Sequence, residues 1–267
     1  MRRLILCSDD FAFSRGVSET IAELAHDGKL NAIGCMTAMP NWPADSRLLR
    51  GLPDHVQIGL HLTLTEERPL TAMPRLTVDN VLPPIETLRR SARRGMLPLG
   101  EIVVEVAAQF DAFIAAMGRP PAFVDGHQHA HALAEIREIV LRETALRAPG
   151  AWVRHCADRP WAMLARPFVG KAIGSAYHSL GLRSAAAAHG LACNDGFAGH
   201  YDFASDYRSM LPCFLRQPGK MHVVMCHPGA GQREGDGIAA AREREAETLR
   251  NVSIADMAAA AGLSFPV

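Results

Sequence analysis

The chain has 267 residues, which suits one large domain or a single barrel, and 48% of them are hydrophobic, enough for a substantial core. Lysine plus arginine and aspartate plus glutamate both number 28, so the formal net charge is zero and no basic excess indicates a nucleic-acid partner. No stretch approaches the roughly 18 apolar residues that a membrane span needs. The start, Met1-Arg2-Arg3, is followed by too short an apolar run for a signal peptide.

In the first part of the chain, short apolar runs alternate with segments of helical period. The pattern predicts strand 3–8, helix 14–28, strand 32–37, helix 43–50 and strand 56–61. Ser14 is a good N-cap for the first helix, and Gly28 is a plausible stop. The segment 62–98 then contains prolines without a strong period, and a connection of this length is usually functional or a lid.

The second part continues the alternation with one weak region. The pattern predicts helix 99–117, strand 122–125, helix 133–146, strand 151–154, helix 202–216, strand 221–226 and helices 237–250 and 254–261. Between 158 and 220 the pattern is weak, and a strand near 183–187 is one interpretation. Ser253 and Gly262 suit the start and the end of the last helix. The fold class is therefore α/β, a single (β/α) barrel or barrel variant with mostly parallel strands, in one domain 1–267 with a long loop insertion near 62–98.

A cluster of titratable side chains follows strand 122–125. Asp125-Gly126-His127-Gln128-His129-Ala130-His131 holds one carboxylate and three imidazoles within seven residues. If the chain stays extended, alternate side chains project to one side, so all four groups could face the same site. Histidine is the commonest neutral metal ligand, and such a cluster is costly to bury unless something uses it. We interpret it as functional, and the alternative is a solvated histidine-rich loop.

Three more predicted strands end in similar groups. Strand 3–8 runs into Asp9 and Asp10, strand 56–61 ends in His61, and strand 221–226 is followed by His227. Two adjacent carboxylates repel each other and usually require a cation or a shared proton. The carboxyl ends of parallel strands gather on one face, where sites are built, so we expect these groups to meet.

The meeting of these groups would provide a hydrolytic site. Asp10, His61 and one histidine of the 127–131 cluster could hold a divalent ion and leave positions open for water and substrate. Asp9 is then a candidate base for the attacking water, and His227 a candidate acid for the leaving group. The chain has no phosphate-binding Gly-rich loop and no nucleophile elbow, which argues against kinases and serine hydrolases.

The same residues resemble the YdjC family of carbohydrate deacetylases, which includes chitooligosaccharide deacetylase and the hopanoid-biosynthesis-associated deacetylase. The resemblance is carried by Asp9-Asp10-Phe11, Gly59-Leu60-His61-Leu62-Thr63, Asp125 to His131, and Cys226-His227-Pro228-Gly229, in that order along the chain. It implies a (β/α) barrel variant, a divalent metal and hydrolysis of an N-acetyl group from a sugar.

The resemblance also implies particular roles. It makes Asp10, His61 and His127 the metal ligands, Asp9 the base and His227 the acid. Arg154 would orient the base, as a similar arginine does in related polysaccharide deacetylases; the alternative for Arg154 is a simple surface ion pair. His129 and His131 would support the ligands or face the substrate, with His129 as the alternative ligand to His127.

Two positions depart from the family motif Asn-Ala-Asp-Asp-Phe-Gly. Cys7 stands in place of the asparagine, and Ala12 in place of the glycine. Neither carries the proposed charge chemistry, so we expect activity to survive. Substrate choice is expected to depend on 62–98 and 158–220, which match the family least.

The cofactor expected is one divalent metal ion. Mixed oxygen and nitrogen ligands suit zinc, manganese, cobalt or nickel, whereas members of the family are commonly described with magnesium. The six cysteines are too few and too dispersed for a disulfide scaffold, which favours a reducing, cytoplasmic location. Cys226 could be a thiol nucleophile, but the apolar run before it favours a buried strand residue.

The expected partner is a small N-acetylated sugar substrate, with no nucleic acid and no membrane span, and a homodimer is left open. Two other functions use similar residues. A metal-dependent phosphoesterase would need a cationic phosphate clamp that the sequence does not show. A non-catalytic sugar-binding module would have no use for a base such as Asp9.

Overall fold

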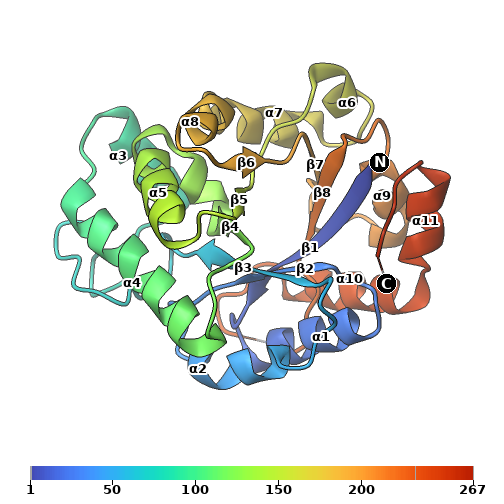
Figure 1. Cartoon of the computed structure of the whole chain (residues 1–267), viewed down its shortest axis with the longest axis horizontal. Helices are drawn as coiled ribbons and strands as arrows, with labels where there is room; N and C mark the ends of the chain where they lie inside the picture. Colours follow the sequence, from blue (N-terminus) through green and yellow to red (C-terminus); the bar gives the residue numbers. More distant parts are fainter. Residues whose placement is uncertain (1, 232, 267) are drawn as a thin grey trace.

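Eight parallel strands form one curled sheet in the structure, a computed structural model that describes residues 2–231 and 233–266. The strands are β1 Arg3–Phe11, β2 Ala32–Cys35, β3 Gln57–Leu62, β4 Phe123–Gly126, β5 Trp152–Val153, β6 Ala192–Cys193, β7 Gly196–Ala198 and β8 Met221–Cys226. Their order is β6-β5-β4-β3-β2-β1-β8-β7, and every pairing is parallel. Between the described residues of β6 and β7 no ladder forms, so the sheet is an open barrel (Figure 1). The predicted parallel barrel variant is confirmed.

Helices surround the sheet. They are α1 Arg15–His26, α2 Trp42–Asp45, α3 Ile85–Arg93, α4 Leu99–Met117, α5 Ala134–Arg147, α6 Pro160–Leu164, α7 Val169–His178, α8 Leu182–Ala188, α9 Tyr207–Phe214, α10 Ala239–Asn251 and α11 Ile254–Ala260, with 3₁₀ turns η1 Ser46–Leu49 and η2 His127–Ala132. The predicted caps are present: the Ser14 hydroxyl accepts from the Val17 N–H, and the Ser253 hydroxyl accepts from the Asp256 N–H. No helix in the described ranges has both the length and the apolar character that crossing a bilayer requires.

The inside of the barrel is filled by side chains. Ile5 and Cys7 of β1 pack there with residues of β8, and the rings of Phe123 and Trp152 stack at 4.8 Å between centroids. A Cβ at Gly59 would lie 2.5 Å from the Phe123 ring, so β3 needs glycine at this point. Because the interior is closed by packing, the cavity lies at one end of the barrel.

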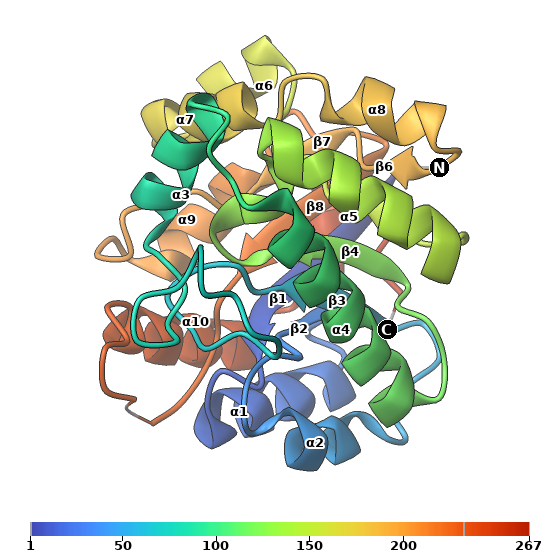
Figure 2. The same cartoon turned by 90° about the vertical axis from the view of Figure 1, so that its left-hand side faces the viewer.

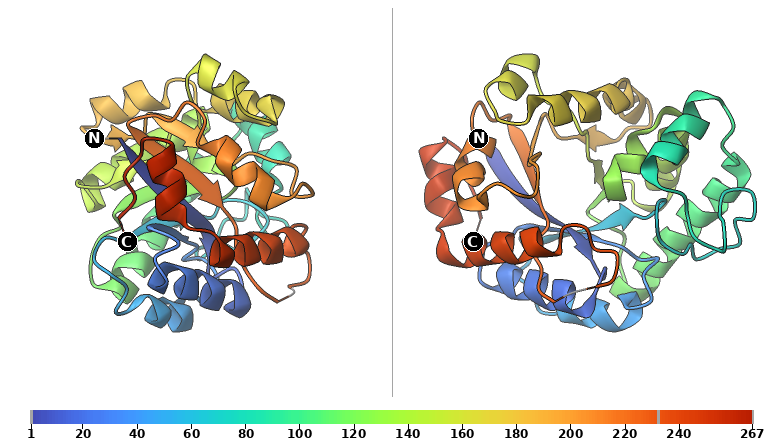
Figure 3. Two further views of the ribbon diagram at one scale, coloured as in Figure 1. Left: turned by 90° about the vertical axis from the view of Figure 1, so that its right-hand side faces the viewer. Right: turned by 180° about the vertical axis from the view of Figure 1, so that it is seen from behind.

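The two ends of the described chain lie side by side at the other end of the barrel. The Leu4 N–H donates to the carbonyl of Ser264, and the Ser264 N–H donates to the carbonyl of Arg2, both at 2.9 Å. Figure 3 shows α10 and α11 along the flank where β1 and β8 lie. This pairing ties the last segment to the first strand of the sheet.

The structure differs from the sequence-based interpretation in two segments. The strand near 183–187 is wrong: this stretch lies in α8, where four consecutive alanines favour a helix. Within 62–98, residues Ile85–Arg93 form α3. The helix buries a single residue, Leu88, so the sequence shows no helical period of apolar residues there. Figure 2 shows the rest of this segment as loops over the flank of α4.

Candidate active site

The carboxyl ends of β1, β3, β4 and β8 meet at a cavity of about 810 Å³. These strands contribute Asp9 and Asp10, His61, His127 and His227 respectively, and all five side chains line the cavity. The prediction that the four strand ends gather on one face is confirmed. Cys226, directly before His227, is buried in β8, as the apolar run indicated.

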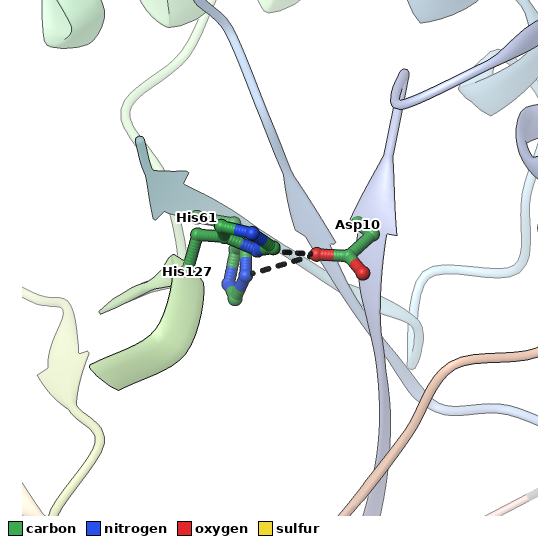
Figure 4. A group of neighbouring side chains, drawn as sticks. All are labelled: Asp10, His61 and His127. Carbon is green, nitrogen blue, oxygen red and sulfur yellow. Dashed lines mark hydrogen bonds and ion pairs between the residues drawn. The ribbon is translucent and has the colours of Figure 1, made fainter. Parts of the chain in front are cut away.

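Asp10, His61 and His127 converge on one point. Oδ1 of Asp10 lies 2.9 Å from Nδ1 of His127 and 3.4 Å from Nε2 of His61, and all three ligand atoms fall within 4.8 Å of one another (Figure 4). Asp10 and His61 lie in β1 and β3, and His127 directly follows β4. One carboxylate and two imidazoles in this arrangement are a donor set that fits a divalent ion such as zinc, manganese, cobalt or nickel.

Asp125 fixes the orientation of His61. Oδ1 of Asp125 lies 2.7 Å from Nδ1 of His61, which leaves Nε2 turned toward Asp10. A carboxylate in this position sets the tautomer of a metal-binding histidine. Burial alone would lower the pKa of His61, but Asp125, Asp9 and Asp10 raise it to about 10. Without an ion, His61 is therefore protonated at neutral pH.

The second oxygen of Asp10 is held by Arg242 of α10. Nη2 of this buried arginine lies 2.8 Å from Oδ2 of Asp10, and its Nε lies 2.9 Å from Asp236. Burial alone would raise the pKa of Asp10, but His127 and Arg242 hold it well below the usual range. No sequence motif indicated Arg242. Its signal was an arginine three residues before Glu245, a spacing that puts both on one face of a helix.

Arg154 holds Asp9 with a paired contact. Nη1 and Nη2 each donate to one Asp9 oxygen at 2.6 Å, and Nη2 also lies 2.5 Å from Oδ2 of Asp125. The arginine is 0% exposed, so the alternative of a surface ion pair is wrong. Burial alone would raise the pKa of Asp9, but Arg154 and the nearby histidines lower it, which keeps this carboxylate ionised.

His227 lies beside Asp9. Its Nε2 is 3.9 Å from Oδ2 of Asp9, and its backbone N–H donates to Glu245 at 2.5 Å. Glu245 also accepts from the Tyr201 hydroxyl, and burial raises the pKa of Glu245 to about 7. Burial lowers the pKa of His227 to about 4, so the resting imidazole is neutral. Glu245 is a second supporting residue that the sequence analysis missed.

The three histidines of the 127–131 cluster point to different places. The prediction of an extended chain is wrong here, because η2 follows β4 and Gln128 and His129 adopt left-handed φ angles of 52° and 61°. His127 faces Asp10, whereas Nε2 of His131 donates to the carbonyl of Arg154 at 2.8 Å. His129 lies in the cavity wall and outside the group that could hold an ion.

The backbone at the end of β1 is strained. Asp10 and Ala12 have φ angles of 65° and 76°, a region that costs about 1–2 kcal/mol for a residue with a Cβ. Strain of this kind collects at functional sites, where it aims a side chain. Ala12 stands where the family motif has glycine, the residue that adopts this conformation without cost.

The fold and the site define a class: a parallel α/β barrel with a carboxylate and two imidazoles at the carboxyl end of its strands, beside an arginine-held aspartate. The YdjC-like protein family model matches residues 3–260, and the chain belongs to this family.

Two curated relatives carry the name chitooligosaccharide deacetylase. The protein of Escherichia fergusonii is 37% identical over 142 residues, which is 52% of this chain and 54% of that protein. The protein of Proteus mirabilis is 36% identical over 137 residues, 51% of this chain and 53% of that protein. The chain thus spans about half the length of the curated relatives it matches.

A solved structure shares the whole fold. It is a protein of Enterococcus faecalis V583 described in terms of cellobiose-phosphate cleavage, with a TM-score of 0.74 over 99% of this chain and 97% of that one. The sequence identity is 19%, so this likeness supports the architecture alone.

Proposed function

We propose that the chain is a metal-dependent hydrolase that removes the N-acetyl group from a small acetylated sugar or oligosaccharide. The observation that carries the proposal is an ionised, arginine-held Asp9 beside the Asp10, His61 and His127 group, in one cavity. Membership of the YdjC-like family and the names of the two curated relatives support the same activity.

Asp10, His61 and His127 would hold the ion. A divalent ion bound there would polarise the amide carbonyl and make water a better nucleophile. Asp125 keeps His61 oriented through its Nδ1, and Arg242 keeps Asp10 oriented through its Oδ2. Magnesium follows from the family resemblance, whereas the donor set suits zinc, manganese, cobalt or nickel, so we propose one divalent ion per chain without choosing among them.

Asp9 would accept the proton of the attacking water. Arg154 contacts both of its oxygens, yet an ionised carboxylate has further lone pairs to offer. The contact fixes the plane of the carboxylate and keeps it charged. Proton transfer by a positioned group of this kind typically contributes about 10²–10⁴-fold to the rate.

His227 would pass a proton to the departing amine. The resting imidazole is neutral, so it has to gain that proton during the reaction. Its Nε2 lies 3.9 Å from an oxygen of Asp9, so Asp9 could hand on the proton that it takes from the water. Glu245 fixes the position of His227 through its backbone, not through its ring.

We also propose that residues 1–267 act as one domain, and that the protein works in the cytoplasm on a small N-acetylated sugar. All six cysteines are free within the described part of the chain, which suits a reducing compartment.

The test is release of acetate from N-acetylated oligosaccharides by protein reconstituted with each candidate ion. The Asp9→Asn variant should keep its metal and lose about 10²–10⁴-fold in kcat. His227→Ala should lose most on sugar amides and least on anilides, whose amines leave easily. Turnover of p-nitrophenyl phosphate instead of amides would favour a phosphoesterase. Sugar binding without turnover, with metal confirmed bound, would favour a binding module.

A further inference from the structure

Helix α7 has its apolar stripe on the outside. Ile173, Tyr177 and Leu180, the last just beyond the helix, follow the spacing of one helix face, and they are 53–65% exposed. The opposite stripe lines the cavity and consists of Lys171, Gly174, Ser175 and His178. A helix on the outside of a barrel normally turns its apolar stripe to the sheet, so α7 is reversed.

The apolar surface continues on α6, the preceding helix. Trp161 and Leu164, three residues apart on this short helix, are 59% and 72% exposed. Figure 1 shows α6 and α7 together on one side of the molecule. We call the five side chains the α6–α7 surface: Trp161, Leu164, Ile173, Tyr177 and Leu180. Clusters of this kind are rare on proteins that work alone, and they mark contact surfaces.

The surface is held in place from beneath. Arg166, between the two helices, is buried, pairs with Asp158 at 2.8 Å and donates from Nε to the Arg216 carbonyl at 2.9 Å. At the far end of α7, Nη1 of Arg137 donates to the carbonyl of Leu180. The exposed side chains therefore stand on an anchored segment.

The same region is rich in positive charge. Residues 159–194 include no aspartate or glutamate and contain Arg159, Arg166, Lys171 and Arg183, although the formal net charge of the whole chain is zero. The guanidinium of Arg159 lies 5.6 Å from the centre of the Trp161 ring. A segment with one sign of charge points to a partner of the opposite sign.

Helix α3 adds a second basic segment beside α7. Residues 87–100 likewise have no acid and contain four arginines, of which Arg90, Arg93 and Arg94 are exposed. Burial lowers the pKa of His178, and Arg89 and Arg93 lower it further, so α3 and α7 lie within range of each other's charges. Figure 2 shows α3, α6 and α7 at the same end of the molecule.

The charge decides between two occupants. A second copy on a two-fold axis would bring this basic region against itself, which like charges oppose. A bilayer with anionic headgroups attracts the arginines and takes up exposed tryptophan, tyrosine and leucine at the level of the headgroups. Glu86 and Glu138, the acids of α3 and α5 near this region, are each paired with an arginine.

We propose that the α6–α7 surface, with the arginines of α3, docks the protein on the surface of an anionic phospholipid bilayer. The contact lies in the plane of the interface. It goes beyond the proposed function and does not depend on it, because binding to lipid is measured without turnover.

The test is co-sedimentation of the full chain with vesicles made of equal parts of phosphatidylglycerol and phosphatidylcholine, and with phosphatidylcholine alone. Binding should favour the anionic vesicles and should fall about tenfold or more between about 0.05 M and about 0.5 M salt. Replacing Arg90, Arg93 and Arg94 together by glutamine should weaken it about 100-fold, at about fivefold for each charge. Arg47, Arg50 and Arg119, exposed residues that follow α2 and α4, supply the matched triple glutamine control.

The apolar contribution has a closely matched control. Leu164 on α6 and Leu146 on α5 are both 72% exposed. Leu164→Ser should weaken vesicle binding about 3- to 10-fold, whereas Leu146→Ser should leave it unchanged. Because both side chains are largely in water, neither variant should unfold, and thermal unfolding checks this.

Tryptophan fluorescence shows which side of the protein meets the lipid. Trp42 and Trp152 are buried, so Trp161 is the tryptophan whose surroundings a bilayer can change. Its emission should shift to the blue on binding and be quenched by brominated lipid, and Trp161→Phe should abolish both changes.

Three results would overturn the proposal. The first is no sedimentation with anionic vesicles at low salt, and the second is an equal loss in Leu164→Ser and Leu146→Ser. The third is binding that leaves the emission of Trp161 unchanged. A dimer that forms without vesicles and is lost in Leu164→Ser would assign the surface to a second copy instead.

Discussion

Metal binding should release a proton from His61. In the ion-free site, the charges of Asp125, Asp9 and Asp10 outweigh burial and raise the pKa of this imidazole to about 10. Nδ1 of His61 keeps its proton and donates it to Asp125 in a hydrogen bond. The proton that an ion must displace is therefore the one on Nε2, which faces Asp10. At pH 8, two units below that pKa, about one site in 100 is ready to bind, which weakens apparent affinity by about 3 kcal/mol.

The affinity for the metal ion should rise with pH. Because the ion competes with a proton, Kd should fall about tenfold for each unit between pH 7 and pH 9, and level off near pH 10. Calorimetry at pH 8 in two buffers of different ionisation enthalpy counts the protons directly. At this pH an ordinary imidazole has already lost its proton, so the expected count of about one belongs to His61.

Asp125→Asn supplies the matched variant. It removes a neighbouring charge that raises the pKa of His61 while keeping the side chain's shape, so fewer protons should be released at pH 8. A pH-independent Kd, together with heats that do not depend on the buffer, would refute the reasoning. It would mean that His61 is neutral before the ion arrives.

Two further predictions concern stability. Arg154→Met should lower the free energy of unfolding in urea by about 3–5 kcal/mol at pH 8, because the charge of Asp9 then stays buried without the arginine that contacts both of its oxygens. The loss should shrink toward pH 5, since without the arginine burial raises the pKa of Asp9 and protonation of this carboxyl relieves the folded state. A loss under about 1 kcal/mol would contradict the buried pair. Ala12→Gly should cost at least about 1 kcal/mol less than Ala22→Gly in the middle of α1, because glycine relieves strain at position 12 and weakens the helix at 22. Equal costs in thermal unfolding would show that position 12 is unstrained.

The sequence predicted the functional strand ends because their apolar runs are bounded by charged groups. Parallel topology then brings Asp10, His61 and His127 together without further information, since β1 to β4 lie in chain order in the sheet. The barrel variant follows from the same alternation of strands and helices. The open edge between β6 and β7 could not be predicted, because strands of two and three residues are too short to show an apolar pattern.

The residues that hold the site in place could not be predicted from single motifs. Arg242 and Glu245 lie more than 200 residues from Asp9 and Asp10 in the sequence. Both are on α10, whose other charged residues are not among the buried ones. The turn at His129 was missed for a different reason: two non-glycine residues at positive φ contradict local preference. Such exceptions to local rules are expected where a site imposes the conformation.

One divalent ion, held by Asp10, His61 and His127, should be required for amide hydrolysis. The most direct measurement strips the protein of metal, restores one ion type at a time, and records ions bound per chain by elemental analysis together with acetate released. Activity should rise in step with one ion per chain, and His61→Ala should take up no ion under the same conditions. If His61→Ala binds the ion as tightly as the parent protein, or the stripped protein releases acetate at the full rate, hydrolysis does not depend on an ion at this site.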